Sequence, residues 1–91
     1  MKYTIRFSGQ FKKSYKLCKR RGYDMTTLQT VMYILGEHGV LPAEYRPHIL
    51  SGNWAGVWDC HIDSDWLLLW ERNEKELILL LLDTGTHSDV F

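Results

Sequence analysis

Two different hydrophobic periods divide the chain. Residues 2–7 alternate apolar Tyr3, Ile5 and Phe7 with polar neighbours, the period of two that predicts a strand with one buried face. From about residue 9 to residue 38 the apolar positions recur at intervals of three and four residues, which predicts helix. The last third returns to short apolar runs separated by turn residues. The chain is therefore predicted to place two helices between one strand and a group of later strands.

The limits of the two helices follow from capping residues. Ser8 offers an N-cap hydroxyl to the first helix, which we expect to end near Gly22. Asp24 caps the second helix, which runs from about Met25 to His38 and ends at Gly39. Each helix carries one apolar stripe, formed by Phe11, Tyr15 and Cys18 in the first and by Leu28, Val31, Met32 and Leu35 in the second.

Strands follow the helices. Pro42 and Pro47 bracket a loop, and residues 50–53 are typical of a turn. Three strands are predicted at about residues 54–63, 66–70 and 77–82, and their short links imply an antiparallel meander. The unbroken apolar run of the last strand suggests helices on one face and a partner chain on the other. The expected fold is α+β with the order β-α-α-β-β-β, two N-terminal helices packed on a twisted antiparallel sheet.

Length and composition narrow the class of protein. The 91 residues include 45% hydrophobic and 24% charged residues, as in an ordinary globular protein, and we expect one domain over residues 1–91. The longest apolar run, residues 77–82, is far shorter than the roughly 20 residues that cross a bilayer. Cys18 and Cys60 are too few for a disulfide scaffold. These features predict a cytoplasmic protein with no membrane partner.

The formal net charge is zero, but the charges are unevenly distributed along the chain. Residues 1–46 hold nine Lys or Arg and three Asp or Glu, whereas residues 47–91 hold two and eight. A basic helix face is by default a solvated surface, and it becomes a nucleic-acid contact only where other features point to RNA. The cations of the first helix that could form such a contact are Lys12, Lys13, Lys16, Lys19 and Arg20.

Imidazoles and a carboxylate gather where the chain builds the meander. His48 precedes its first strand, His61 lies near the end of that strand, Asp65 lies in the next turn, and His87 follows the last strand. In a meander these positions can meet at one edge of the sheet. Imidazoles suit RNA cleavage, because one can take the 2′-hydroxyl proton while another donates to the leaving 5′-oxygen. Asp65 would hold the tautomer of a neighbouring histidine or act as a base.

Other interpretations of these residues stay open. Trp66 or Phe91 could stack an unpaired base. The remaining tryptophans are interpreted as packing residues: Trp54, Trp58 and Trp70. A zinc site built from the three histidines and Asp65 is an alternative, although no short ligand pair such as HxxxH is present. Cleavage by imidazoles needs no metal and no cofactor, and we expect neither.

Three motifs resemble the YafQ branch of the RelE/ParE toxin superfamily. They are H-x-L-x-G-x-W at residues 48–54, C-H-I-x-x-D-W at residues 60–66, and T-G-T-H-S at residues 84–88. The resemblance spans the chain and implies a RelE-like fold and a type II toxin. Toxins of this family are ribosome-dependent endoribonucleases that cut mRNA in the A site. Their partner is a small antitoxin of the DinJ or RelB kind, often a ribbon-helix-helix protein, through which alone they reach operator DNA.

The resemblance also assigns roles to residues. It implies a catalytic group formed by His48, His61, Asp65 and His87. It places Trp66 and Phe91 close to the site. The basic face of the first helix becomes a contact to ribosomal RNA, which should be sensitive to salt. The main hypothesis is a metal-independent mRNA interferase.

One position departs from the family. Members frequently carry an arginine just before the T-G-T-H segment, where it can stabilise charge on the reacting phosphate, and this chain has Asp83. A carboxylate facing a phosphate is repulsive unless Arg46 or Arg6 compensates or the side chain points away. Asp83 therefore predicts attenuated activity. It also favours the alternative of a non-cleaving module that binds RNA, the ribosome or the antitoxin, and a metal-dependent hydrolase is a third hypothesis.

Overall fold

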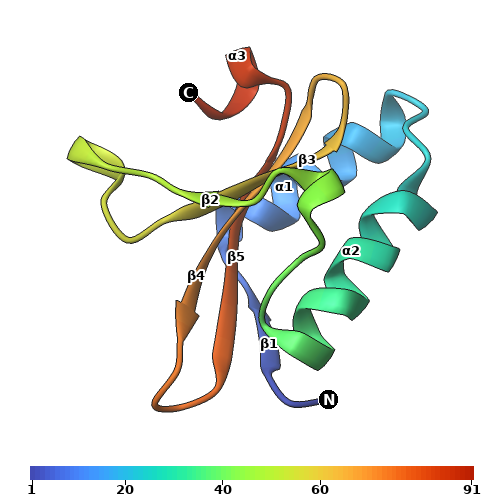
Figure 1. Cartoon of the computed structure of the whole chain (residues 1–91). Helices are drawn as coiled ribbons and strands as arrows, with labels where there is room; N and C mark the ends of the chain where they lie inside the picture. Colours follow the sequence, from blue (N-terminus) through green and yellow to red (C-terminus); the bar gives the residue numbers. More distant parts are fainter.

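The computed structural model describes residues 1–91 as a five-stranded sheet with two long helices on one face and a short helix at its end (Figure 1). The expected α+β class is confirmed. The elements are β1 (Thr4–Phe7), α1 (Gly9–Arg20), α2 (Met25–His38), β2 (His48–Ile49), β3 (Trp58–Asp63), β4 (Trp66–Asn73), β5 (Ile78–Gly85) and α3 (His87–Val90), with 3₁₀ turns at Ala43–Tyr45 and Gly52–Trp54.

The sheet has the strand order β1-β5-β4-β3-β2. Strands β3, β4 and β5 form the predicted antiparallel meander. Strand β1 runs parallel to β5, so the sheet is mixed and the expectation of a wholly antiparallel sheet is corrected. The intervening elements supply the long connection that a parallel neighbour requires. The short β2 pairs with β3 where the sequence predicted only a loop.

Both long helices begin and end as their caps predict. The Ser8 hydroxyl accepts a hydrogen bond from the Phe11 N–H at 2.9 Å, and the Asp24 carboxylate accepts one from the Thr26 N–H at 3.1 Å. Gly39 ends α2 with φ 73°. A Cβ there would overlap the Tyr3 ring, so the position requires glycine for space as well as for conformation.

The main core lies between the two long helices and the sheet. It consists of 14 buried residues, drawn from α1, α2 and strands β3, β4 and β5, together with Tyr3 before β1 and Leu41 after α2. On β5, Leu79 and Leu81 are fully buried under the helices, while Leu80 and Leu82 on alternate positions remain partly exposed. The face of the sheet away from α1 and α2 has only a smaller cluster, formed by Leu67, Leu69 and Val90 of α3. The prediction that helices cover one face of the last strand is confirmed, and α3 covers part of the other.

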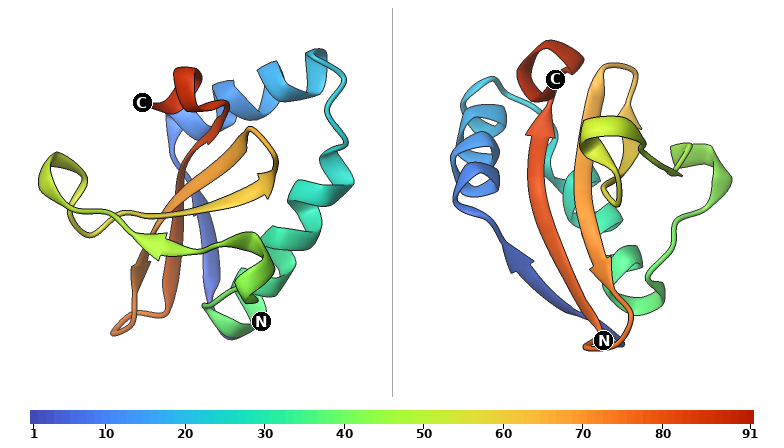
Figure 2. Two further views of the ribbon diagram at one scale, coloured as in Figure 1. Left: turned by 45° about the horizontal axis from the view of Figure 1, so that its top comes forward. Right: turned by 90° about the vertical axis from the view of Figure 1, so that its left-hand side faces the viewer.

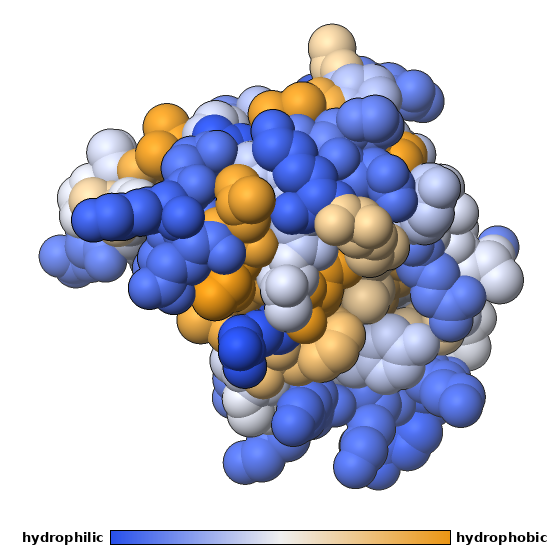
Figure 3. All heavy atoms as spheres, turned by 90° about the horizontal axis from the view of Figure 1, so that it is seen from below, coloured by the Kyte–Doolittle hydropathy of each residue, from blue (hydrophilic) through white to orange (hydrophobic).

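Several large apolar side chains remain at the surface. Seen from below the orientation of Figure 1, apolar residues gather in a band across the molecule, bordered by hydrophilic ones (Figure 3). The exposed large apolar residues are Met1, Phe7, Tyr33, Val40, Ile49, Trp54, Leu77 and Phe91. None of the helices is both long and apolar enough to span a bilayer.

Candidate active site

The surface of β3, β4 and β5 that faces away from α1 and α2, here called the open face, carries the predicted histidines. Successive residues of a strand point to opposite sides. Cys60 and Ile62 of β3 enter the core beneath the helices, so Asp59 and His61 point to the open face. The C-terminal helix α3 and the loop between β2 and β3 lie at the margins of this face (Figure 2).

One pair of residues joins α3 to the turn between β3 and β4. Asp65 Oδ1 accepts a hydrogen bond from the His87 backbone N–H at 3.1 Å and lies 2.7 Å from His87 Nδ1. The hydrogen bond from the His87 side chain holds the pKa of Asp65 below its ordinary value, so the carboxylate is ionised and can only accept. Nδ1 therefore carries a proton, and Nε2 is left to exchange one with a ligand. This geometry supports the tautomer-holding role predicted for Asp65.

The segment that presents His87 is held by several local interactions. Thr86 and Asp89 form a reciprocal capping box at the start of α3. Asp89 also pairs with Arg21 at the end of α1, with 2.6 Å between Nη1 and Oδ2. Gly85 has φ 149°, and a Cβ on it would lie 2.8 Å from the Asp89 side chain. The position of His87 thus depends on a glycine that no other residue can replace without a shift of α3.

A second pair joins β2 to β3. His48 Nδ1 lies 3.1 Å from the Arg46 carbonyl oxygen, which can only accept, so this nitrogen carries a proton. His48 Nε2 lies 3.0 Å from Oδ1 of Asp59, whose side chain is only 6% exposed. The two atoms form no hydrogen bond in the structure, and Oδ1 has no other donor. A proton on His48 Nε2 or on Asp59 turns this contact between two acceptors into an attraction.

Burial governs the ionisation of the two open-face residues on β3. Burial raises the pKa of the Asp59 carboxyl, and the charge of His48 offsets part of that rise. Burial also lowers the pKa of the His61 imidazole, and the positive charge of Arg46 lowers it further. The His61 ring lies 5.8 Å from that of His87, measured between centroids, and its Nδ1 is buried without a partner. The site therefore holds a neutral His61 between two histidine–carboxylate pairs.

Comparison with known proteins identifies the family. Residues 3–91 match the family model described as the bacterial toxin of type II toxin-antitoxin system, YafQ. The chain belongs to this family. It is also 39% identical over 88 residues to the mRNA interferase toxin YafQ of Escherichia coli K12, which covers 96% of this chain and 94% of that protein. The resemblance inferred from the three motifs is thereby confirmed.

Solved structures of YafQ and of related toxins share the fold. The YafQ chain in the E. coli DinJ-YafQ complex superposes with a TM-score of 0.88 at 37% identity, over 98% of each chain. A metal-bound toxin from Helicobacter pylori superposes with a TM-score of 0.89 at 31% identity, over 98% of this chain and 99% of that one. In the present YafQ-family chain, no three His, Cys, Asp or Glu side chains are arranged so that they could hold a metal ion.

The residue that departs from the YafQ-family pattern is turned away from the histidines. The Asp83 carboxylate accepts hydrogen bonds from the Ser14 hydroxyl of α1 and from the Thr84 N–H. Its charge acts on the buried thiol of Cys18 in α1, whose pKa is raised mainly by burial. The charges that shift the pKa of His61 come instead from Arg46, Asp59 and the other two histidines. The sequence left three outcomes for Asp83: repulsion of the phosphate, compensation by Arg46 or Arg6, or a side chain that points away. The structure supports the last of these.

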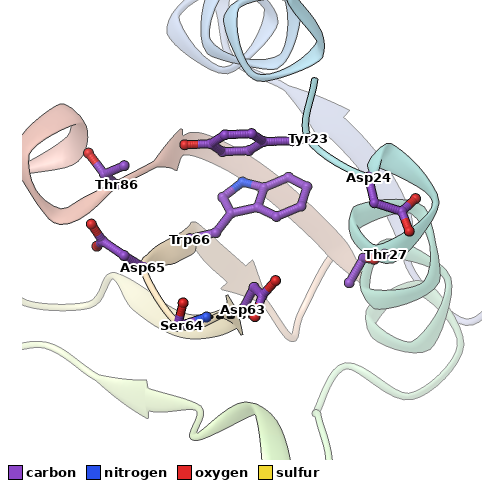
Figure 4. Close-up of a pocket in the computed structure, with 8 residues that line it drawn as sticks. All are labelled: Tyr23, Asp24, Thr27, Asp63, Ser64, Asp65, Trp66 and Thr86. Atoms are coloured by element: carbon purple, nitrogen blue, oxygen red, sulfur yellow. Dashed lines mark hydrogen bonds between the residues drawn. The ribbon is translucent and has the colours of Figure 1, made fainter. Parts of the chain in front are cut away.

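The structure gives Trp66 a place in the core. Its indole is 5% exposed, its Nε1 donates to the Thr84 hydroxyl at 2.9 Å, and the Tyr23 ring packs against it edge-on (Figure 4). The pocket of about 350 Å³ beside it is lined by three carboxylates and no cation. Such a pocket repels phosphate, and the buried indole has no free face for a base. This placement argues against the predicted stacking role of Trp66.

The remaining predicted residues lie in two places. Arg46 and Phe91 lie near the histidines, since Arg46 acts on His61 and the Phe91 ring lies 6.4 Å from that of His87. The predicted RNA-contacting cations are all exposed on α1, and they are not part of the histidine cluster: Lys12, Lys13, Lys16, Lys19 and Arg20.

Sequence analysis missed the role of Asp59 in this site. A usable signal was present, because Asp59 is a charged residue inside an apolar strand and lies two positions before His61, hence on the same face. Its pairing with His48 had no such signal, since that contact depends on the unpredicted β2, which sets His48 directly opposite Asp59.

Proposed function

We propose that this chain is an mRNA interferase, an endoribonuclease that cuts mRNA on the ribosome by acid–base catalysis without a metal. The carrying observation is the arrangement of two histidine–carboxylate pairs around His61 on the open face. Membership of the YafQ toxin family supports it, as does the mRNA interferase name of the E. coli relative. Cleavage through the 2′-hydroxyl requires one group that accepts a proton and one that donates a proton, and an imidazole can serve as either.

The reaction needs two proton transfers. The 2′-oxygen loses a proton and forms a bond to phosphorus, while the bond from phosphorus to the 5′-oxygen breaks and that oxygen gains a proton. His87 Nε2 exchanges one of these protons, because Asp65 holds the other ring nitrogen. We assign the other transfer to the pair of His48 and Asp59, acting through a proton taken up at His48 Nε2 or at the Asp59 carboxyl. His61, kept neutral by burial, is able to accept a proton or a hydrogen bond at neutral pH.

Charge on the reacting phosphate calls for a cation. Asp83 does not meet this need, but it also does not oppose it, because its carboxylate is held by Ser14. Arg46 is the cation whose charge reaches His61, and we assign it the contact to the phosphate. Activity should therefore persist in spite of Asp83.

We propose a cytoplasmic antitoxin of the ribbon-helix-helix kind as the inhibitor, with operator DNA bound only through it. The E. coli relative is seen in a complex with DinJ. The partner should cover apolar surface around the sheet and supply basic residues to residues 47–91, which hold eight acidic and two basic side chains. Titration calorimetry against the protein encoded beside this one tests the idea, and no measurable affinity would refute it.

The decisive experiment compares wild type with His87→Ala during induced expression in a bacterium, with primer extension on a reporter mRNA. His38→Ala serves as a matched control, because His38 is exposed at the end of α2. We expect growth arrest and new mRNA ends with wild type and the control, and neither with His87→Ala. Purified ribosomes, free mRNA and a chelator then test the dependence on the ribosome and on metals.

A non-cleaving module of the same fold is the second candidate, favoured by Asp83 at the position where the family carries arginine. It predicts growth arrest with intact mRNA, equally in wild type and in His87→Ala.

A further inference from the structure

Trp54 differs from the other three tryptophans in its exposure. Its side chain is 40% exposed, whereas Trp66 and Trp70 are 5% and 1% exposed and Trp58 is partly buried against Trp70. Trp54 belongs to neither buried cluster of the protein. Packing in the core therefore does not account for this residue.

The loop between β2 and β3 holds Trp54 at the surface by its own backbone. Gly52 and Gly56 flank it with φ 66° and 87°, conformations that favour glycine. The Trp54 N–H donates to the Ser51 carbonyl, and the Trp54 carbonyl accepts from the Val57 N–H at 3.0 Å. Local hydrogen bonds and the two glycines thus define the conformation of the loop, and this conformation exposes the indole of Trp54.

The Trp54 ring meets Phe91, which is itself 52% exposed. Their centroids lie 5.2 Å apart at an angle of 81°, and the Phe91 ring lies 6.4 Å from that of His87. An exposed aromatic surface therefore continues from the loop through Phe91 to the imidazole whose Nε2 is free. In Figure 2 the loop and α3 lie at the same margin of the sheet.

We propose that Trp54, together with Phe91, binds an unpaired nucleobase of the RNA by stacking, next to the phosphate on which His87 acts. The proposal rests on the proposed function, since it supplies the substrate contact of the same site. Stacking on aromatic rings suits single-stranded RNA, because every base has a flat π face. The sequence suggested this role for Trp66 or Phe91, and Trp54 thereby takes the place of Trp66 beside Phe91.

The test measures two quantities for Trp54→Ala and Trp54→Phe. One is kcat/KM for mRNA cleavage on the ribosome, and the other is affinity for a short oligoribonucleotide that carries a 2′-deoxy sugar at the cleavage site. We expect Trp54→Ala to lose on the order of tenfold in both, and Trp54→Phe to keep most of each. Tyr33→Ala, which removes an exposed aromatic ring from α2, should change neither.

Fluorescence gives an independent readout, because Trp54 is the most exposed indole. Binding of the oligoribonucleotide should quench the wild-type emission, and the quenching should disappear in Trp54→Phe. The inference is overturned if wild type cleaves mRNA while Trp54→Ala matches it in kcat/KM and affinity, or if Trp54→Ala weakens only antitoxin binding. Quenching without any cleavage by wild type would instead sink the proposed function and leave the stacking contact standing.

Discussion

The two faces of the sheet differ in the side chains that they bury, and strand β3 contributes to both faces. Toward the helices it presents Cys60 and Ile62, which are buried among apolar neighbours. Toward the open face it presents Asp59 and His61. One polar atom of each, Oδ1 of Asp59 and Nδ1 of His61, is buried without a hydrogen-bond partner. Such polar atoms lower the stability of the folded state. The helix face thus stabilises the fold, whereas the open face retains buried titratable groups whose polar atoms lack hydrogen-bond partners.

The helix face also contains buried polar atoms, but most of them have hydrogen-bond partners. On the helix face the Trp66 Nε1 donates to the Thr84 hydroxyl, which in turn donates to the Leu67 carbonyl, so these buried polar atoms are satisfied. Trp70 Nε1 is the exception on that face. Unsatisfied polar atoms are therefore not a property of one face alone, but only the open face combines them with titratable groups.

The largest expected effect comes from the helix face. Leu79→Ala should lower the free energy of unfolding by about 2–5 kcal/mol, because it leaves a cavity in a fully buried site. Activity per folded molecule should stay unchanged. Leu80→Ala, the neighbouring position on the partly exposed side of β5, should cost clearly less. Denaturant unfolding of both variants measures this difference, and equal losses would contradict the contrast between the faces.

An intermediate effect comes from the open face, where activity and stability should separate. Asp59→Asn removes the carboxyl that faces His48, and we expect activity to fall on the order of a hundredfold. Burial raises the pKa of Asp59 in the folded state, so ionisation costs wild-type stability as pH rises above the unfolded value of about 3.9. The variant should therefore be the more stable of the two at neutral pH.

Two measurements check the Asp59 prediction: the rate of mRNA cleavage and the midpoint of thermal unfolding. Both are recorded from pH 3 to pH 8 in steps of about half a pH unit. The stability gain of Asp59→Asn should vanish below about pH 4, where the wild-type carboxyl is protonated in both states. Asp63→Asn is the matched control, since Asp63 is exposed at the end of the same strand. Full activity of Asp59→Asn would show that Asp59 takes no part in catalysis.

The smallest expected effect concerns the pair that ties α3 to α1. The hydrogen bond from Arg21 lowers the pKa of Asp89 to about 2 in the folded state. Its contribution to stability is therefore present above about pH 4 and is lost as pH falls toward 2. Arg21→Ala should lower the unfolding midpoint slightly at pH 7, and the difference from wild type should shrink to nothing at the acid end. A constant difference across this range would show that the pair is not responsible.

Local patterns were sufficient for the elements and for part of the site. The caps at Ser8 and Asp24, the two helical stripes and the meander strands were all predictable, because each depends on residues within a few positions of one another. The three motifs predicted the YafQ family, and each motif contains one of the three histidines. Period alone also separates Cys60 from His61 on β3.

Contacts between distant segments decided the rest. The pairing of β1 with β5, of His48 with Asp59, and of His87 with Asp65 joins positions that are set by strand order and register. Alternation from Leu79 and Leu81 would also send the Thr84 side chain to the open face, but an extra residue in β5 opposite β4 puts Thr84 in the core. One such bulge reverses which face a side chain takes, and no local period reveals where it falls.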